Sequence, residues 1–376
     1  MPKLRSIFMM ILIAGALWYV YGETYQQSGT QGAWREISND INDIKESPNV
    51  IATTEVINQE FQKIVDWVTD HLSKEEQQDQ PTLVKPSLDK PTNQTFSVHN
   101  IEIGDNRSDV EKQVGEPERS TLNEYGVDWV AYHQNYHNFF MVAYDSHDKV
   151  AGLYTNQDLL TSNNNITFDS SRESVLSTLG EPLKGIQKGF ITYQTQNNQE
   201  HATFLIDNNY VTIFFDKHEN YTMTAIQIIN KELEEQKEKY FAQPSKLLME
   251  GFEYQLFDLT NAARVNHELP VLTWEESLRK TARDHSVDMA DNNYFSHTNL
   301  EGLSPFDRMK EDDIVFQLAG ENLAVGQTSS IFAHEGLMNS QGHRENILKE
   351  EFESLAVGVA FNNDSQPYYT ENFITK

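Results

Sequence analysis

Two histidines and one glutamate near the C-terminal end of the sequence are the side chains best suited to chemistry. They lie in three short runs, Tyr294-Phe295-Ser296-His297, Ala319-Gly320-Glu321-Asn322-Leu323-Ala324 and Met338-Asn339-Ser340-Gln341-Gly342-His343-Arg344. Imidazole and carboxylate groups share protons near neutral pH or bind a borderline divalent cation. The runs lie near expected loops and element ends, from which side chains can converge. We therefore expect the functional centre here.

This set of side chains is compatible with three kinds of site. Two imidazoles and one carboxylate can hold a tetrahedral ion with one position open for water or a ligand, so His297, Glu321 and His343 are predicted to bind a divalent cation, Zn²⁺ or Ca²⁺. The same residues could instead form a polar network that only fixes loops. A hydrolase would also need a general acid or base, and Ser340 and Ser296 are weak candidates without an activating neighbour. No catalytic residue is assigned.

The order of these motifs, closed by Tyr368-Tyr369-Thr370-Glu371-Asn372-Phe373, resembles the bacterial branch of the CAP superfamily, which comprises the cysteine-rich secretory, antigen 5 and pathogenesis-related 1 proteins. The resemblance covers roughly the last 130 residues, and several motifs in the right order make it specific. It implies an α-β-α sandwich with a cleft lined by two histidines and two glutamates. His297 and His343 match the histidines, and Glu321 matches the first glutamate.

The second glutamate of the family is where this chain departs from the pattern. Ser340 stands at that position, and Glu335 lies five residues earlier. On a helix this separation turns Glu335 about 140° round the axis from Ser340. Glu335 is therefore expected to be a poor substitute for the missing ligand.

Charge and cysteine content exclude several functions. Lys and Arg number 29 against 57 Asp and Glu, so the formal net charge is −28. Such an excess of acid argues against nucleic acid as a partner. The chain has no cysteine, which rules out disulfides and cysteine nucleophiles. In this respect the chain resembles the cysteine-poor secreted proteins of Gram-positive bacteria. Its 376 residues, 38% of them hydrophobic, suffice for two folded units.

Residues 1–22 have the order of an export signal. Lys3 and Arg5 precede an apolar run over residues 7–21. A helix of this run spans about 22 Å, short of the roughly 30 Å hydrocarbon core, but Trp18 and Tyr19 can extend it at the membrane interface. No small-x-small cleavage site follows, which favours an uncleaved signal-anchor over a cleaved signal peptide. The protein is thus expected on the extracellular face of the cell membrane, or secreted.

Residues 23–95 are predicted to form a tether. They are largely polar, apart from one apolar stripe at helical spacing formed by Ile57, Phe61, Ile64, Val65 and Val68. Three prolines then mark a partly stiff, extended linker from Ser73 to Gln94. Such a tether would hold folded parts away from a membrane.

Residues 96–230 contain an internal repeat. The run from Ile103 to Pro117 recurs as Phe168 to Pro182, offset by 65 residues. Each copy predicts a short helix, capped by Asn106 or Ser170 and ended by a glycine, and then two strands. The expected strands are residues 139–144, 150–154, 210–215 and 222–228. A repeat followed by a CAP domain resembles exported bacterial proteins with a CAP-associated N-terminal domain, and the repeat is the expected site for a protein partner.

A charged helix over residues 231–247 is expected to link the repeat to a C-terminal domain, residues 248–376. Helices are predicted there at residues 252–263, 274–289, 306–309 and 329–339, and a closing hairpin at 355–361 and 367–373. The helix at 306–309 is expected at the rim of the cleft, and Gly342 is expected to free the backbone that presents His343. His285, on an apolar stripe, is expected to be a hydrogen-bonded core residue.

The predicted fold class is α+β, a C-terminal α-β-α sandwich preceded by a duplicated helix-plus-antiparallel-sheet domain. The predicted function is that of an exported, membrane-tethered protein whose His/Glu cleft binds a divalent cation or an envelope ligand, which would be a lipid, a peptide or a wall component. The alternative is a metal-dependent secreted hydrolase that acts on peptide or cell-wall polymer.

Overall fold

The computed structural model describes residues 85–188, 191–194 and 199–376. The predicted signal-anchor, the amphipathic stripe and the first part of the linker lie outside the described residues. Among the residues that are described, no helix combines the length and apolar character needed to cross a membrane.

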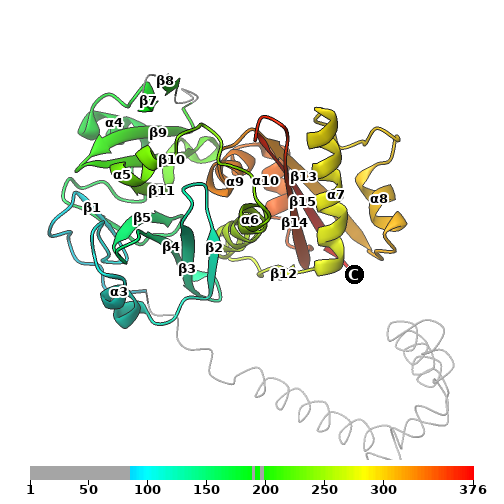
Figure 1. The fold of residues 1–376 in the computed structure, drawn as a ribbon. Helices are drawn as coiled ribbons and strands as arrows, with labels where there is room; N and C mark the ends of the chain where they lie inside the picture. Colours follow the sequence, from blue (N-terminus) through cyan, green and yellow to red (C-terminus); the bar gives the residue numbers. More distant parts are fainter. Residues whose placement is uncertain (1–84, 189–190, 195–198) are drawn as a thin grey trace, which may run out of the picture. The chain divides into compact units, whose positions relative to one another are not determined.

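An antiparallel sheet organises the N-terminal module, residues 85–237 (Figure 1). Its strand order is β2-β3-β4-β5-β11-β10-β9. The strands are β2 (Arg119–Leu122), β3 (Asp128–Gln134), β4 (His137–Tyr144), β5 (Val150–Thr155), β9 (His201–Ile206), β10 (Asn209–Asp216) and β11 (Thr222–Asn230). The four predicted strands are confirmed as β4, β5, β10 and β11. The two hairpins that they form join through the β5–β11 pairing into one continuous sheet.

Two short helices cover one face of this sheet. They are α3 (Arg107–Val114) and α4 (Arg172–Leu179), and they bury Val110 and Val175 in the same hydrophobic cluster as the sheet residues Val142 and Val211. Each helix ends, as predicted, at a glycine with positive φ, +89° at Gly115 and +84° at Gly180. Residues with a β-carbon rarely adopt this conformation, so glycine is favoured where the chain leaves the helix.

The predicted cap of the second helix is wrong by one residue. Ser171, not Ser170, accepts the amide hydrogen of Ser174. Ser170 is engaged elsewhere, because its hydroxyl accepts the amide of Thr167. Two adjacent serines cannot be separated by cap preference alone, and the local turn decides between them.

Two small strand pairs flank the large sheet. One joins β1 (Phe96–Val98) to β6 (Leu160–Ser162), and the other joins β7 (Gly185–Lys188) to β8 (Ile191–Gln194). The described end of the predicted linker is tied to this module, because Glu102 accepts the amides of Thr92, Asn93 and Gln94.

A second, four-stranded sheet forms the middle layer of the C-terminal module, residues 245–376. Its order is β12 (Thr273–Trp274), β14 (Ser354–Phe361), β15 (Pro367–Thr375) and β13 (Leu318–Val325). The predicted closing hairpin is confirmed as β14 and β15, which pair antiparallel.

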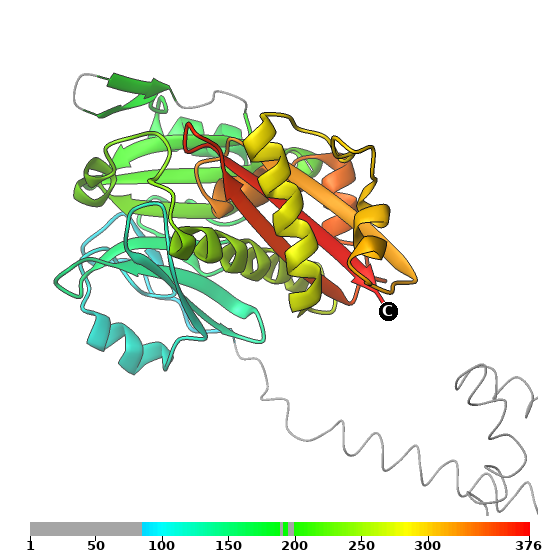
Figure 2. The same ribbon diagram turned by 45° about the vertical axis from the view of Figure 1, so that its right-hand side comes forward.

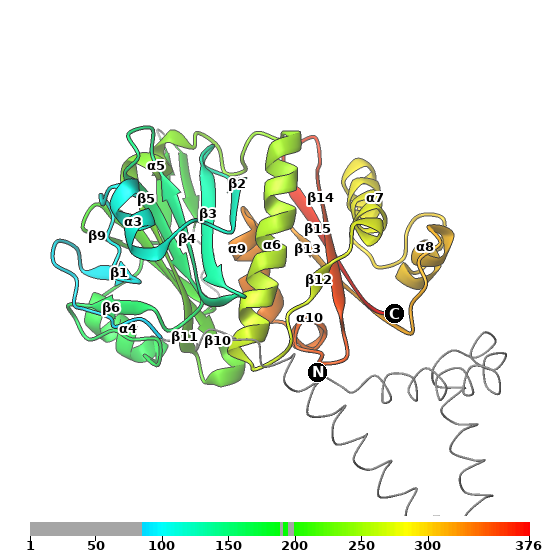
Figure 3. The same cartoon turned by 90° about the horizontal axis from the view of Figure 1, so that it is seen from below.

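Helices cover both faces of this sheet. Figure 3 shows α7 (Glu276–Asn292) and α8 (Pro305–Glu311) on one side, and α6 (Lys246–Asn266), α9 (Ser330–Met338) and α10 (Gln341–Ile347) on the other. In Figure 2 the long helix α7 lies along the strands that it covers. The predicted α-β-α sandwich and the α+β fold class are confirmed.

The predicted linker helix over residues 231–247 is wrong beyond Gln236. Helix α5 (Lys231–Gln236) is short, and the next helix begins only at Lys246. The ammonium group of Lys188 donates hydrogen bonds to the main-chain carbonyls of Glu234 and Lys237. These carbonyls at the end of the helix therefore have a hydrogen-bond donor from another part of the chain. The charge pattern of the segment did not reveal this distant partner.

The two modules pack through the other face of the N-terminal sheet. Trp129, Phe139 and Phe214 on that face share one hydrophobic cluster with residues of α6 and α9, including Leu259 and Ile331. The sheet is therefore buried on both faces, which explains why its strands read as continuous apolar runs.

A close contact between the two modules, at Gly251, predicts that one added methyl group lowers the stability of the protein. A Cβ atom at Gly251 in α6 would lie 2.1 Å from the carbonyl oxygen of Leu122 in β2. Alanine normally stabilises a helix interior by about 1 kcal/mol relative to glycine. Here we expect Gly251→Ala to lower the thermal unfolding midpoint, because the clash is with main-chain atoms and cannot be relieved by a side-chain rotation.

Gly336→Ala in α9 is the matched control, since nothing lies within 4 Å of a Cβ atom built there. This variant should unfold at the parent temperature or slightly above it. A Gly251→Ala protein as stable as the Gly336→Ala protein would contradict the close packing of α6 on β2.

Candidate functional site

His297 and Glu321 meet directly at the predicted centre. The Nδ1 atom of His297 lies 2.9 Å from Oε1 of Glu321. Glu321 projects from β13 and its side chain is 2% exposed, whereas His297 lies in the loop between α7 and α8 and is 53% exposed. A carboxylate accepts hydrogen bonds, so Nδ1–H is the donor. The neutral ring is thereby held in the tautomer whose Nε2 carries a lone pair, the form that binds a metal ion or a proton.

Arg308 is the third member of this group. Its Nη2 atom donates to Oε2 of Glu321 at 2.6 Å, and both side chains are almost fully buried. Its Nη1 atom donates to the main-chain carbonyl of His297 at 2.8 Å. Arg308 therefore compensates the buried carboxylate and also fastens the loop that carries the imidazole. Sequence analysis placed its helix at the cleft rim but did not assign Arg308 a role.

His343 lies beside this group, in the first turn of α10. Its pKa is lowered, first by burial and second by the positive charge that His297 can carry. The helix that carries His343 lies against the strand of Glu321, because Asn346 of α10 donates to the main-chain carbonyl of Glu321 at 3.3 Å. The lowered pKa keeps His343 neutral at physiological pH, which is the state that binds metal ions.

The expected role of Gly342 is wrong. Gly342 and His343 are both helical, and the amide of Arg344 donates to the carbonyl of Ser340 at 2.8 Å. Ser340 caps the helix by position, without a side-chain capping bond. A serine followed closely by glycine reads as a loop, but the helix begins immediately after the serine.

A buried polar chain lies behind His343. Asn322 donates through Nδ2 to the carbonyl of His343 at 3.1 Å and to Glu371 at 3.0 Å. Thr260 donates to the other oxygen of Glu371 at 2.9 Å. Asn322 and Glu371 are direct cross-strand partners of β13 and β15. Both residues belong to the motifs named from the sequence, but their hydrogen bond was not predicted. The signal that could have indicated it is a pair of polar residues in two strands that are otherwise apolar.

The N-terminal module holds the turn that precedes His343. Asn339, the last residue before this turn, accepts the amide of Lys217 and donates to the carbonyl of Phe215. Arg344 pairs with Asp216 at 2.7 Å. These residues of the N-terminal module flank the end of β10, so the position of α10 depends on both modules.

Two other side chains considered from the sequence lie outside the centre. Glu335 faces the N-terminal module and accepts a hydrogen bond from the hydroxyl of Tyr154 at 2.8 Å, in line with its expected poor fit as a ligand. His285 is buried, and its Nε2 atom lies 2.9 Å from the carbonyl oxygen of Ser296, which confirms it as a core residue.

The carboxylate of Glu321 is already engaged by protein groups. Both oxygens of Glu321 are already engaged, one by His297 and one by Arg308, so this carboxylate orients an imidazole. Within the described part of the chain, no three or more His, Asp or Glu side chains are grouped to hold a metal ion. Two neutral imidazoles with a carboxylate behind one of them remain a suitable set for an ion that completes its shell with water or ligand atoms.

The buried ion pair can be tested by a double-mutant cycle. Arg308→Met leaves the carboxylate of Glu321 buried without its cation, so we expect the free energy of unfolding to fall by about 3–5 kcal/mol. Glu321→Gln should also be destabilising, because it leaves the guanidinium of Arg308 buried without its anion. In the double variant no charge is left unpaired, and its loss should be clearly smaller than the sum of the two single losses, as measured by urea unfolding. Additive losses would contradict the pairing.

The buried acid behind His343 predicts a pH effect on stability. Burial raises the pKa of Glu371 to about 7 from an ordinary 4.5, although hydrogen bonds from Asn322 and Thr260 oppose the rise. The folded state therefore holds this proton more tightly than the unfolded state. The resulting stabilisation, about 3 kcal/mol, is complete below the unfolded pKa and is lost as the pH rises through 7.

Glu371→Gln should remove this contribution. Its unfolding free energy is expected to vary less between pH 5 and pH 8 than that of the parent, in urea titrations at several pH values. Glu124 and Glu335, which are also buried with pKa values of about 7, remain in both proteins and leave a residual slope. Parallel curves for the two proteins would refute a protonated Glu371.

Comparison with known proteins agrees with this architecture. The CAP-associated N-terminal family matches residues 103–240, and the cysteine-rich secretory protein family, CAP, matches residues 257–373. The uncharacterized membrane protein YlbC of Bacillus subtilis is 29% identical over 292 residues, which cover 73% of this chain and 82% of YlbC. The uncharacterized protein YkwD of the same organism is 41% identical over 126 residues, 34% of this chain and 48% of YkwD.

Two solved structures have the same fold. An extracellular protein with an SCP domain from Bacillus anthracis matches with a TM-score of 0.63 and 27% identity, over 78% of this chain and all of that chain. A cysteine-rich secretory protein from Staphylococcus aureus matches with a TM-score of 0.58 and 12% identity, over 77% of this chain and all of that chain, and supports the fold alone. The chain therefore combines a CAP-associated N-terminal domain with a domain of the cysteine-rich secretory protein family, CAP, and its structural neighbours are SCP-domain proteins of bacteria.

Proposed function

We propose that this CAP protein acts at the cell surface as a binding protein, and that its two cleft histidines hold a divalent cation that helps to bind an envelope ligand. The observation that carries the proposal is the chain of contacts from Arg308 through Glu321 to His297. It fixes one imidazole in its metal-binding tautomer, and His343, whose lowered pKa favours the neutral ring, lies on the helix that contacts the strand of Glu321.

The donor atoms favour zinc over calcium. Zn²⁺ accepts imidazole nitrogen readily, whereas Ca²⁺ takes six to eight oxygen ligands. Glu321 is the carboxylate that contacts His297, and its two oxygens are already bound, one to His297 and the other to Arg308. An ion bound here would use the two rings and would keep positions for water or for ligand atoms.

The same contacts favour binding over hydrolysis. A hydrolytic site needs a group that can take or give a proton beside the bound water. Glu321 is paired with a buried arginine and serves to orient His297, so it is poorly placed for that task. The ligand we propose is an envelope component, a lipid, a peptide or a wall fragment.

The proposed location rests on two kinds of support. YlbC, the relative that matches most of this chain, is described as a membrane protein, and the similar Bacillus anthracis structure is that of an extracellular protein. The basic and apolar order of residues 1–22 is that of an export signal. We infer that the chain is exported and stays tethered through residues 7–21, or is released.

Isothermal titration of the full-length, chelator-treated chain with ZnCl₂ tests the ion site. We expect one Zn²⁺ per chain, with binding abolished by His297→Ala and by His343→Ala. Glu321→Gln should weaken it by about 10–100-fold, because it removes the group that orients His297. CaCl₂ should bind far more weakly.

His147→Ala is the matched control, since this histidine is exposed and lies in a turn of the N-terminal module. Zinc affinity unchanged in His297→Ala would refute the assignment of the site. A peptide and peptidoglycan turnover screen in parallel addresses the hydrolase alternative: metal-dependent turnover that His343→Ala abolishes would replace the binding role.

A further inference from the structure

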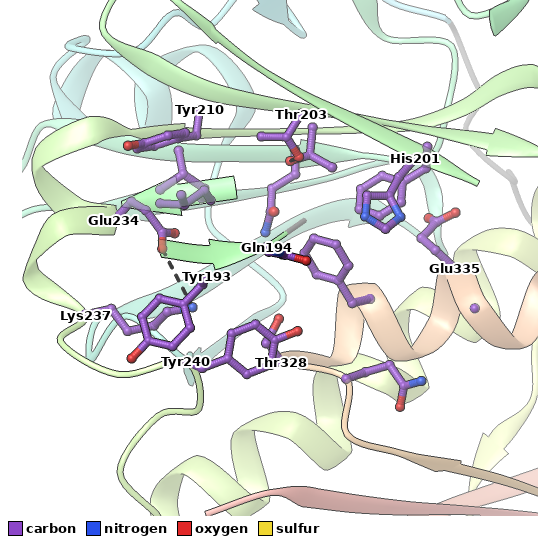
Figure 4. Close-up of a pocket in the computed structure, with 18 of the residues that line it drawn as sticks. Tyr193, Gln194, His201, Thr203, Tyr210, Glu234, Lys237, Tyr240, Thr328 and Glu335 are labelled. Carbon is purple, nitrogen blue, oxygen red and sulfur yellow. Dashed lines mark hydrogen bonds and ion pairs between the residues drawn. The ribbon is translucent and has the colours of Figure 1, made fainter. Parts of the chain in front are cut away.

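A cavity of about 170 Å³ lies between the N-terminal sheet and helix α9 (Figure 4). Its walls come from β7 to β11 and α5 of the N-terminal module, and from α9 and the loop before it in the C-terminal module. His297, Glu321 and His343 do not line it. It is therefore separate from the proposed ion site and needs its own explanation.

At one end of the cavity the charged side chains are paired with one another. The ammonium group of Lys188 lies 2.6 Å from a carboxylate oxygen of Glu234, and that of Lys237 lies 3.9 Å from the same oxygen. Lys237 also lies 5.0 Å from the centre of the Tyr125 ring. These charges and partners compensate one another, so this end does not demand a charged ligand.

The other end contains a buried acid without a cation. Glu335 is almost fully buried, and its carboxyl accepts a hydrogen bond from the hydroxyl of Tyr154. Burial raises its pKa to about 7, and the negative charge of Asp216 adds to the rise. Among the described residues Glu335 forms no ion pair, and the guanidinium of Arg344, which lines a neighbouring cavity with it, is paired with Asp216 at 2.7 Å. A buried carboxyl that lacks a counter-ion must hold a proton or receive a cation from outside.

Aromatic rings surround this end. His201 and Glu335 both line the cavity (Figure 4), and the ring centre of His201 is 5.4 Å from that of Phe332 and 5.9 Å from that of Phe214. Burial lowers the pKa of His201 to about 4, so this ring is uncharged at neutral pH and does not serve as the missing cation. Aromatic faces next to a carboxylate attract a bound ammonium group.

A second orphaned polar group lines the cavity. Gln227 in β11 is 2% exposed, and its Nε2 atom has no hydrogen-bond partner among the described residues. An unsatisfied buried donor costs about 1–3 kcal/mol, which a ligand acceptor such as an amide carbonyl would recover. The cavity thus offers a carboxyl and aromatic faces for a cation, and an amide donor for a carbonyl.

We propose that this cavity binds the ammonium group of a lysine-type side chain carried by a peptide, with Glu335 as its counter-ion, Phe214 and Phe332 as its walls, and Gln227 as donor to a carbonyl of the same peptide. The site is independent of the ion at the histidine pair. The peptide belongs to an exported protein or to a wall polymer, two sources that present the same chemistry.

Ligand-observed NMR and calorimetry on the full-length chain test the proposal. The probe is Nα-acetyl-L-lysine N-methylamide, and the matched probe is the norleucine analogue, which has the same carbon chain without the ammonium group. We expect the lysine probe to bind at least tenfold more tightly. Glu335→Gln keeps the size of the side chain and a hydrogen-bond acceptor for Tyr154, and it should abolish the preference for lysine.

Three further variants make the outcome decisive. Phe332→Leu should weaken the lysine probe several-fold, and it tests the site even if Glu335→Gln does not fold. Glu301→Gln, an exposed acid in the C-terminal module, and His297→Ala should leave lysine binding unchanged. Equal binding of the two probes, or parent-like lysine binding in both Glu335→Gln and Phe332→Leu, would overturn the proposal whatever the zinc titration shows. If the site is confirmed, lysine-containing wall peptide and lysine-containing protein segments can then be compared as competitors.

Discussion

The carboxylate of Glu321 is the constraint on which the C-terminal module depends. It sits in the middle of β13, away from water, and the loss of its hydration has to be offset by protein groups. Arg308 supplies the opposite charge, and His297 uses the second oxygen. Because Arg308 also binds the carbonyl of His297, one ion pair fixes a strand, a helix and a loop together. The orientation of the exposed imidazole is a consequence of that buried arrangement.

The other half of the centre is positioned from a different direction. His343 lies in α10. Residues at the end of β10 in the N-terminal module hold the start of α10, and Asn322 of β13 donates to the main-chain carbonyl of His343. The cleft of the CAP domain is thus assembled partly from contacts that the CAP domain does not contain. The N-terminal domain contributes to the geometry of the histidine pair as well as to the surface of the protein.

The features that follow from local pattern could be predicted from the sequence. The hairpins β4–β5, β10–β11 and β14–β15 were readable because apolar strands alternate with turn residues, and α3 and α4 because a glycine ends each helix. The three motif residues were found through their order along the chain. His297 and Glu321 do meet, and the helix that carries His343 contacts the main chain of Glu321.

The features that depend on distant partners could not be predicted. Lys188 ends helix α5 from 46 residues away, and no periodicity in either segment encodes that contact. Arg308 received no role from the sequence, because its partner is the carboxylate of Glu321 on a strand 13 residues later. Gly342 was misread because glycine signals a loop in isolation, whereas the hydrogen bond from Arg344 to Ser340 continues a helix through it.

The sheet of the N-terminal module is apolar on both sides, and this has a consequence for the independence of the two modules. Without the C-terminal module, Trp129 and Phe214 would lie on an exposed apolar surface. The hydrophobic interior that the two modules share is therefore part of the stability of each of them.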